Sequence, residues 1–146
     1  MDIRNALLKS GKEEFLAHGF ENASLRTICR NAGVTTGAFY SHFSRKEDLF
    51  LALVEPMLAE FQGVYGEVIR RELKDLTTGT DNELTSTTYA IKHRDEFRLL
   101  FDCSKGTKYE GFKDWLLEEF FLPGYQAVFD SHAGKPVDPV LVRVVL

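Results

Sequence analysis

The sequence predicts an all-α protein with a small N-terminal head and a longer helical body. Apolar residues recur at the three- and four-residue spacing of a helix along most of the chain. No stretch sustains the period-two alternation of a half-buried strand, and no Asn-Gly or Asp-Gly pair marks a hairpin. Ser, Thr and Asp precede several helical stretches and glycines follow others, as at helix ends.

The first helix is expected to place Leu8, Gly11 and Phe15 on one face. Gly19 is expected to end it, because glycine takes a positive φ at little cost. Phe20 then folds back as the apolar contact of this helix end.

A tight turn joins the next two helices. The second helix is expected over residues 25–31 with Ser24 as its N-cap, and the third over residues 36–41 with Thr35 as its N-cap. Between them, Ala32-Gly33-Val34 offers a small residue for a close crossing, a glycine for a positive φ and an apolar plug. Two short helices joined in this way form a helix-turn-helix.

The body continues the helical pattern. The capping box Ser44-Arg45-Lys46-Glu47 opens a fourth helix, expected to reach about Leu73 with a kink near Pro56. A second capping box, Thr107 to Glu110, opens a long helix that Pro123-Gly124 must bend or split. The remaining expected elements are a loop at 77–82, helices over about 83–92, 95–104 and 107–129, a loop at 131–136, and a helix from Pro139 capped by Asp138.

The composition is that of a folded, cytoplasmic protein. Of 146 residues, 44% are hydrophobic and 27% charged, which excludes a disordered chain. There is no run of 18 uncharged apolar residues and no signal peptide pattern, so no membrane span is expected. Cys29 and Cys103 are too few for a disulfide framework and are expected to be buried, inert thiols.

The net charge of -4 does not exclude nucleic acid as a partner, because the charge is unevenly distributed. Residues 1–50 carry seven basic and six acidic residues, a net of +1. Residues 51–146 carry 11 basic and 16 acidic residues, a net of -5. The head is therefore the more basic part of the chain.

Residues 15–50 resemble the DNA-binding head of the TetR/AcrR family of one-component transcriptional repressors. The matching positions are Phe15, Gly19-Phe20, Ile28, Ala32-Gly33-Val34, Gly37, Tyr40, His42-Phe43, Lys46-Glu47 and Leu49. The resemblance implies a helix-turn-helix DNA-binding domain over residues 1–47 and a helical ligand-binding and dimerisation domain over residues 48–146. The family forms its dimer interface from two C-terminal helices, and this sequence has only the start of one. We therefore expect the C-terminal end to be truncated.

The resemblance also implies the DNA contacts. Thr36 and Ala38 match positions that read the major groove, and Gly37 matches a position where the backbone approaches the DNA. Other matched positions reach phosphates. The complete implied set is Arg26, Thr35, Thr36, Gly37, Ala38, Tyr40, Ser41, His42 and Lys46. For these residues the competing interpretations are ordinary ones: Tyr40 as a half-buried core aromatic, His42 as a structural histidine, and Arg26 and Lys46 as solvated charges.

Four positions depart from the family pattern. Ala23 stands where threonine or serine is common, so one backbone contact is expected to be missing. Ser10-Gly11 stands where two alanines are usual, and a helical glycine costs about 1 kcal/mol relative to alanine. Ala38 is often threonine, and alanine contacts a thymine methyl but makes no hydrogen bond, so the operator sequence cannot be inferred.

The implied function is that of a sequence-specific transcriptional repressor. A homodimer binds double-stranded operator DNA, and a small-molecule inducer of unknown identity releases it by tilting the fourth helix. The alternative is a helical ligand-binding protein that no longer binds DNA specifically. No enzyme motif, cofactor fingerprint or metal-ligand spacing is visible, so we predict neither an enzyme nor a cofactor or metal site.

The candidate ligand-binding residues are less specific, because an aromatic stripe at helical spacing is more often core than pocket. Glu119 is expected near the middle of one apolar face, where a carboxylate needs a partner or water, unless a bend at Pro123 exposes it. The candidates are Phe61, Tyr65, Tyr89, Phe101, Phe112, Trp115 and Glu119.

Overall fold

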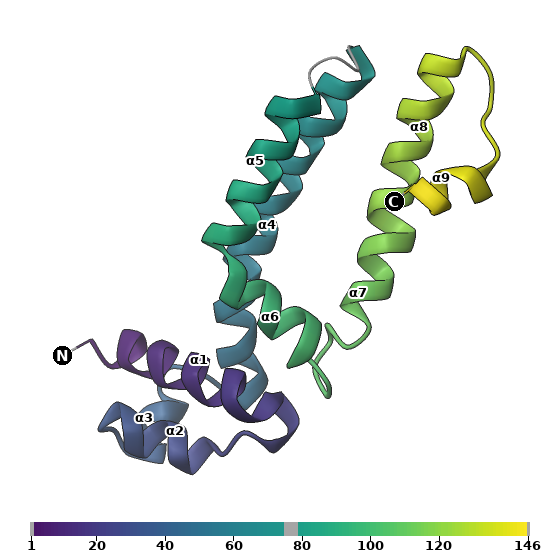
Figure 1. Cartoon of the computed structure of the whole chain (residues 1–146). Helices are drawn as coiled ribbons and strands as arrows, with labels where there is room; N and C mark the ends of the chain where they lie inside the picture. The colour runs from purple at the N-terminus through teal and green to yellow at the C-terminus, as the bar shows by residue number, and fades with distance from the viewer. Residues whose placement is uncertain (1, 75–78, 146) are drawn as a thin grey trace. The chain divides into compact units, whose positions relative to one another are not determined.

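The computed structural model describes the backbone of residues 2–74 and 79–145, and their side chains except those of 79–84 and 145. Within these ranges every regular element is a helix, which confirms the all-α fold (Figure 1). The elements are α1 (Ile3–Asn22), α2 (Leu25–Ala32), α3 (Thr36–Tyr40), α4 (Lys46–Lys74), α5 (Gly79–Lys92), α6 (Arg94–Asp102), α7 (Phe112–Trp115), the π-helix η2 (Leu116–Phe121), α8 (Leu122–Ala133) and α9 (Pro139–Val145).

The helices form two compact units. The first unit comprises Met1–Ala59 and His93–Phe112, and the second comprises Glu60–Lys92 and Lys113–Leu146. The first unit therefore holds α1, α2, α3 and α6, and α4 contributes to both units. The division into functional domains at residue 47 stays a prediction.

The end of α1 forms as expected. Gly19 has φ 74° and ψ 160°, which breaks the helix at the position where glycine was expected to end it. The Phe20 ring then lies 5.7 Å from the Phe15 ring and 5.6 Å from the Phe50 ring, measured between centroids. Phe15 and Phe50 are fully buried, so the turn at Gly19 closes one end of the core of the first unit.

The helix-turn-helix also forms as predicted. Ser24 Oγ accepts a hydrogen bond from the Thr27 N–H at 3.2 Å, and Thr35 Oγ1 accepts one from the Ala38 N–H at 3.1 Å. Gly33 adopts the left-handed conformation with φ 70° and ends α2. Both N-caps and the turn glycine are therefore confirmed.

The start of α4 differs by one residue from the expected capping box. The Arg45 N–H donates to the Asp48 carboxylate at 3.0 Å, so Asp48 closes the box on Arg45 rather than Glu47 on Ser44. Glu47 instead accepts a hydrogen bond from the Lys108 N–H at 2.9 Å. A competing tertiary contact therefore shifts the box, which local sequence alone does not show.

Three expectations for the body are wrong. Residues 79–82 were expected in a loop but belong to α5, while 77 and 78 lie outside the described residues. Residues 131–133 were also expected in a loop but belong to α8. The Thr107 capping box opens no helix, because α7 starts only after Gly111, whose φ is 82°.

The Thr107 segment forms a hydrogen-bonded turn instead. Thr107 Oγ1 donates to the Ser104 carbonyl at 2.7 Å, and the Glu110 carboxylate accepts from the Gly106 N–H at 2.9 Å. Thr and Glu serve turns as well as helix starts, so the same residue pattern fits both structures.

The helical segment around Pro123 is continuous, but its helix type changes from a π-helix to an α-helix. Residues Leu116–Phe121 form the π-helix η2, and α8 then begins with Pro123 among its first residues. Proline cannot donate the backbone hydrogen bond that an uninterrupted α-helix requires, and a π-turn just before it accommodates that loss. Further on, Asp138 accepts from the Val140 N–H at 2.9 Å, so the predicted cap of α9 is confirmed.

Candidate nucleic-acid interface

Helix α3 is anchored by two buried aromatic residues, and the residues between and around them are exposed. Phe39 is fully buried and Phe43 is 4% exposed, with their ring centroids 5.6 Å apart. The residues predicted to contact DNA from this helix lie on the opposite side. Thr35, Thr36, Gly37, Tyr40, Ser41 and His42 are exposed, and Ala38 is partly exposed. We call these seven residues the α3 face.

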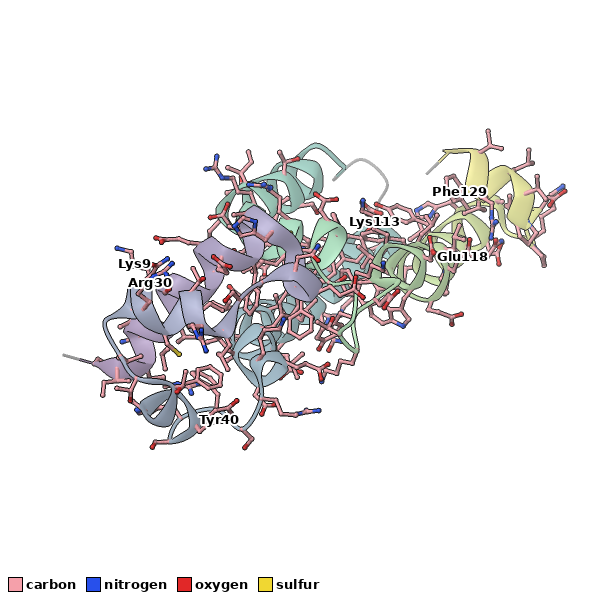
Figure 2. All side chains as sticks on the ribbon, turned by 90° about the horizontal axis from the view of Figure 1, so that it is seen from below. Lys9, Arg30, Tyr40, Lys113, Glu118 and Phe129 are labelled. Carbon is pink, nitrogen blue, oxygen red and sulfur yellow. The ribbon has the colours of Figure 1, made fainter. Side chains whose placement is uncertain are left out.

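Tyr40 is the large aromatic side chain of the α3 face, and it is labelled in Figure 2. Its exposed fraction is 59%, and its ring packs edge-on against Phe39 at 5.3 Å. A half-buried core position, the ordinary alternative for Tyr40, does not describe this geometry. The ring contacts Phe39 on one side, and more than half of the residue is exposed to solvent.

Two hydroxyl groups of the α3 face already have backbone partners. Thr35 Oγ1 caps α3, and Ser41 Oγ donates to the Gly37 carbonyl at 3.3 Å. Both residues remain exposed. Thr36, by contrast, lies in the first turn of α3 with its side chain exposed, which suits a base contact.

Lys46 lies in a different environment from the one predicted for a phosphate contact. Its ammonium group donates to the Phe20 carbonyl at 2.7 Å and to the Ala23 carbonyl at 2.9 Å. It also lies 4.6 Å from the centroid of the Phe20 ring. Burial lowers the pKa of Lys46, and the negative charges of Glu14 and Glu21 partly offset that effect. Lys46 therefore stabilises the α1–α2 junction, whereas Arg26 is exposed near the start of α2.

Two buried polar contacts between α1 and α2 were not anticipated. The Glu14 carboxylate, 9% exposed, accepts a hydrogen bond from the Ser24 N–H at 3.0 Å. The buried Ser10 hydroxyl donates to the Ile28 carbonyl at 2.8 Å. The available signal was that Ser10 and Glu14 are polar residues one turn apart beside the apolar stripe of α1. Together they fix α2, and with it the helix-turn-helix, against α1.

Helix α1, on which the helix-turn-helix packs, is also joined to α6 within the first unit. Lys12 Nζ lies 3.3 Å from an Asp95 oxygen and 3.1 Å from a Glu96 oxygen. The Phe20 N–H donates to the Cys103 carbonyl at 2.9 Å. Residues distant in sequence thus contact α1 at Lys12 and at Phe20, and local sequence patterns carry no information about such pairs.

Three candidate ligand-binding residues meet in the second unit. The Phe61 ring lies 5.6 Å from Tyr65 and 6.0 Å from Tyr89. The same cluster includes Phe120, Phe121 and Tyr125, which were not among the candidates: the ring centroids of Tyr65 and Phe121 lie only 4.7 Å apart. Burial, and then a hydrogen bond with Tyr125, raise the pKa of Tyr65 far above its ordinary value. We call these six residues the aromatic cluster.

The remaining candidates lie elsewhere or face solvent. Phe101 and Phe112 belong to the first unit, where their rings stack at 5.9 Å. Trp115 is 42% exposed, with its ring 6.0 Å from Phe120. Glu119 is exposed, as the bend interpretation expected. The π-helix η2 explains this, because its extra residue per turn rotates Phe121 inward where an α-helix stripe would place Glu119.

Other chemistry is not visible in the described part of the chain. No group of three His, Cys, Asp or Glu side chains there is placed to hold a metal ion. None of the described helices has the length and hydropathy needed to cross a membrane. Cys29 and Cys103 are both buried free thiols, and burial raises the pKa of each.

The chain is similar to known regulatory proteins. Residues 7–53 match the family profile described as bacterial regulatory proteins, tetR family. The chain is 38% identical over 64 residues to the HTH-type transcriptional repressor AcnR of Corynebacterium diphtheriae. This alignment covers 44% of this chain and 34% of that protein. The chain is also 35% identical over 63 residues to the HTH-type transcriptional regulator UidR of Escherichia coli. That alignment covers 40% of this chain and 32% of that protein. The alignments thus span about a third of these relatives.

A solved structure extends the likeness over the whole chain at the level of fold. It is the crystal structure of native NalD, described as the secondary repressor of the MexAB-OprM multidrug efflux pump in Pseudomonas aeruginosa. The TM-score is 0.51 at 23% sequence identity, over 98% of this chain and 78% of that one.

Proposed function

We propose that the protein is a transcriptional repressor that binds operator DNA sequence-specifically, and the match of residues 7–53 to the tetR family of bacterial regulatory proteins supports this proposal. The observation that carries this proposal is the α3 face. Its short helix is fixed from below by Phe39 and Phe43 and presents a threonine, a glycine, an alanine and a tyrosine to solvent. Small and hydrogen-bonding groups on a rigid helix suit close approach to the edges of base pairs.

The roles within the α3 face follow from side-chain chemistry. Thr36, Gly37 and Ala38 lie at the start of the helix and would face the bases, while Tyr40, Ser41 and His42 would reach phosphates. Arg26 would add a contact from α2. For Lys46 we propose that its main role is to hold the α1–α2 junction, since both hydrogen bonds of its ammonium group go to backbone carbonyls there.

We further propose that the protein acts as a homodimer controlled by a small-molecule ligand that binds in the second unit. The aromatic cluster supports an apolar ligand site, because aromatic rings supply the apolar contacts that such sites require. Binding there would release DNA if the ligand favoured the conformation that fits the operator less well. The buried free thiols agree with a reducing compartment, and we propose a cytoplasmic location.

Selection of bound duplexes from a random-sequence pool tests the proposal. The protein should enrich one motif, arranged as two half-sites about 10 base pairs apart if two copies bind together. Tyr40→Phe removes one hydroxyl and keeps the ring on Phe39, so it should weaken binding to all duplexes and leave the motif unchanged. Thr36→Ala should change the preferred base at one position per half-site, by about 1–3 kcal/mol of discrimination. A wild-type pool that remains random in sequence contradicts the proposal.

A further inference from the structure

Arg4 lies beside the α3 face although it belongs to a different helix. It occupies the first turn of α1 and is exposed. Its guanidinium carbon lies 4.8 Å from the centroid of the Phe43 ring. Phe43 packs on Phe39 and directly follows His42, the last residue of the α3 face, so the cation lies over the side chain that is next in sequence to that face. A guanidinium over an aromatic ring is attracted to it and keeps a defined position.

Two cations of residues 1–50 are paired with carboxylates, whereas Arg4, like Lys9, Arg26 and Arg30, forms no ion pair within the described residues and is the one of these four that lies over an aromatic ring. Lys12 is paired with Asp95 and Glu96, and Arg45 with Glu47 and Asp48. Across the part of the chain that the structure describes, Arg4 forms no ion pair with a carboxylate. Its charge is therefore available to an external anion. Because the Phe43 ring already restrains the side chain, binding would also cost less conformational entropy than for a free arginine.

We infer that Arg4 contacts a phosphate of the bound DNA, next to the phosphates that Tyr40 and His42 reach. This inference rests on the proposed function and adds a contact from α1 that neither the family profile nor the sequence pattern assigns. A guanidinium matches the geometry of a phosphate through two parallel hydrogen bonds. Such a contact contributes affinity and salt dependence but carries no sequence preference.

The competing explanation is that Arg4 only covers the buried Phe43 ring. Arg4→Met separates the two, because methionine retains an apolar cover and removes the charge. Arg4→Lys retains the charge and an attraction to the ring. Lys9→Met serves as the matched control, because Lys9 is exposed on the same helix. It is five residues further along, which corresponds to about 140° around the axis of an α-helix.

The experiment measures affinity for one selected duplex and for one random duplex over a range of salt concentrations. For Arg4→Met, the slope of log affinity against log salt should be shallower by about 0.9 per bound copy. Between 50 and 200 mM salt this variant should therefore lose about 3.5-fold less affinity than wild type, per contact removed. Both duplexes should be affected equally. Arg4→Lys should retain most of the slope, and Lys9→Met should alter it less than Arg4→Met does.

The outcomes separate this inference from the proposed function. If the wild-type protein prefers the selected duplex and Arg4→Met leaves the salt slope unchanged, the inference is overturned and the proposed function stands. A slope lowered equally by Lys9→Met also overturns it, because the effect then reflects total charge. If wild type shows no preference for the selected duplex, the proposed function itself fails. Thermal unfolding of each variant checks that it is folded. If Arg4→Met is unfolded, the salt slopes of Arg4→Lys and Arg4→Gln are compared instead, because the first retains the charge and the second removes it.

Discussion

Lys46 shows how one residue of a recognisable pattern can have a structural contact that the pattern does not reveal, while its phosphate contact stays a prediction. The resemblance assigned it to a phosphate, yet its ammonium group donates to the carbonyls of Phe20 and Ala23. These carbonyls lie at the end of α1, where backbone acceptors run short of helical partners, and the Phe20 carbonyl also accepts from the Ala23 N–H at 3.3 Å. A cation also interacts favourably with the negative end of the helix dipole. At residue scale, the same lysine therefore fixes the position of α2 and of the helix-turn-helix.

Lys46→Met should lower the free energy of unfolding by about 1–3 kcal/mol, because it removes the hydrogen bonds from the ammonium group to the Phe20 and Ala23 carbonyls and leaves the Phe20 carbonyl with only the 3.3 Å bond from the Ala23 N–H. Urea unfolding followed by circular dichroism measures this change. Tyr40→Phe is the control, since its hydroxyl lies on the exposed α3 face, and its stability should stay within about 0.5 kcal/mol of wild type. If Lys46→Met has wild-type stability but binds DNA weakly, the ammonium group contacts phosphate instead.

At the scale of elements, the packing of α1 on α4 explains a residue that the family pattern disfavours. Glycine at position 11 costs helix stability relative to the usual alanine. A Cβ added to Gly11 would lie 2.7 Å from Leu49 Cδ2 and 3.1 Å from Leu49 Cγ. Leu49 is fully buried, so it has little room to move. The glycine therefore lets the two helices approach more closely than alanine would allow.

Gly11→Ala should consequently destabilise the protein by about 1 kcal/mol, because an overpacking cost of about 1–3 kcal/mol exceeds the gain in helix propensity. Gly63→Ala is the matched control within α4, since an added Cβ there meets no atom within 4 Å. It should stabilise the protein by about 0.5–1 kcal/mol. The double variant Gly11→Ala with Leu49→Val should recover part of the loss. Denaturant unfolding measures the free energy of unfolding of wild type, the two single variants and the double variant. A Gly11→Ala protein that is more stable than wild type would contradict this packing.

The elements that could be predicted are those whose ends depend on nearby residues. The caps at Ser24, Thr35 and Asp138 and the turn at Gly33 need only a side chain and the next three backbone groups. The capping box at Thr107 failed because its hydrogen bonds also close a turn. The π-helix η2 carries no comparable local signal, and it changes which residues face inward. The sequence pattern therefore included Glu119 among the candidate ligand-binding residues and left out Phe121, which belongs to the aromatic cluster.

The same division applies to the candidate site. The exposure of Thr36, Tyr40 and His42 could be predicted, because a short helix with a buried Phe39 leaves few other arrangements. The contacts of Glu14, Lys46 and Arg4 could not, since each joins residues separated by ten or more positions. They depend on how the helices pack, which no single helix determines.

At the scale of the whole molecule, the first unit joins two stretches far apart in the sequence. Lys12 on α1 reaches Asp95 and Glu96 on α6, 84 residues from Glu96 in sequence. Burial lowers the pKa of Lys12, but hydrogen bonds and charges from Glu96 and Asp95 outweigh it, so the pKa lies above the ordinary 10.5. The ion pairs therefore stabilise the folded state while the lysine is charged.

This raised pKa fixes the sign of a pH dependence. The contribution of Lys12 is fully present below the unfolded value of about 10.5 and is lost as pH rises through the higher folded value. Lys12→Met should lower the free energy of unfolding by about 0.5–1 kcal/mol at pH 7. The difference from wild type should shrink above about pH 10.5, where wild type loses the charge as well. A difference that is constant up to pH 11.5 would mean that the ion pairs contribute nothing and only packing was lost.

The central claim is that the α3 face recognises a specific DNA sequence. The most direct measurement is the affinity of the wild-type protein, at physiological salt, for the duplex upstream of its own gene and for a shuffled duplex of the same composition. We expect the upstream duplex to bind at least about 10³-fold more tightly than the shuffled duplex. Equal affinity for the two duplexes would contradict it.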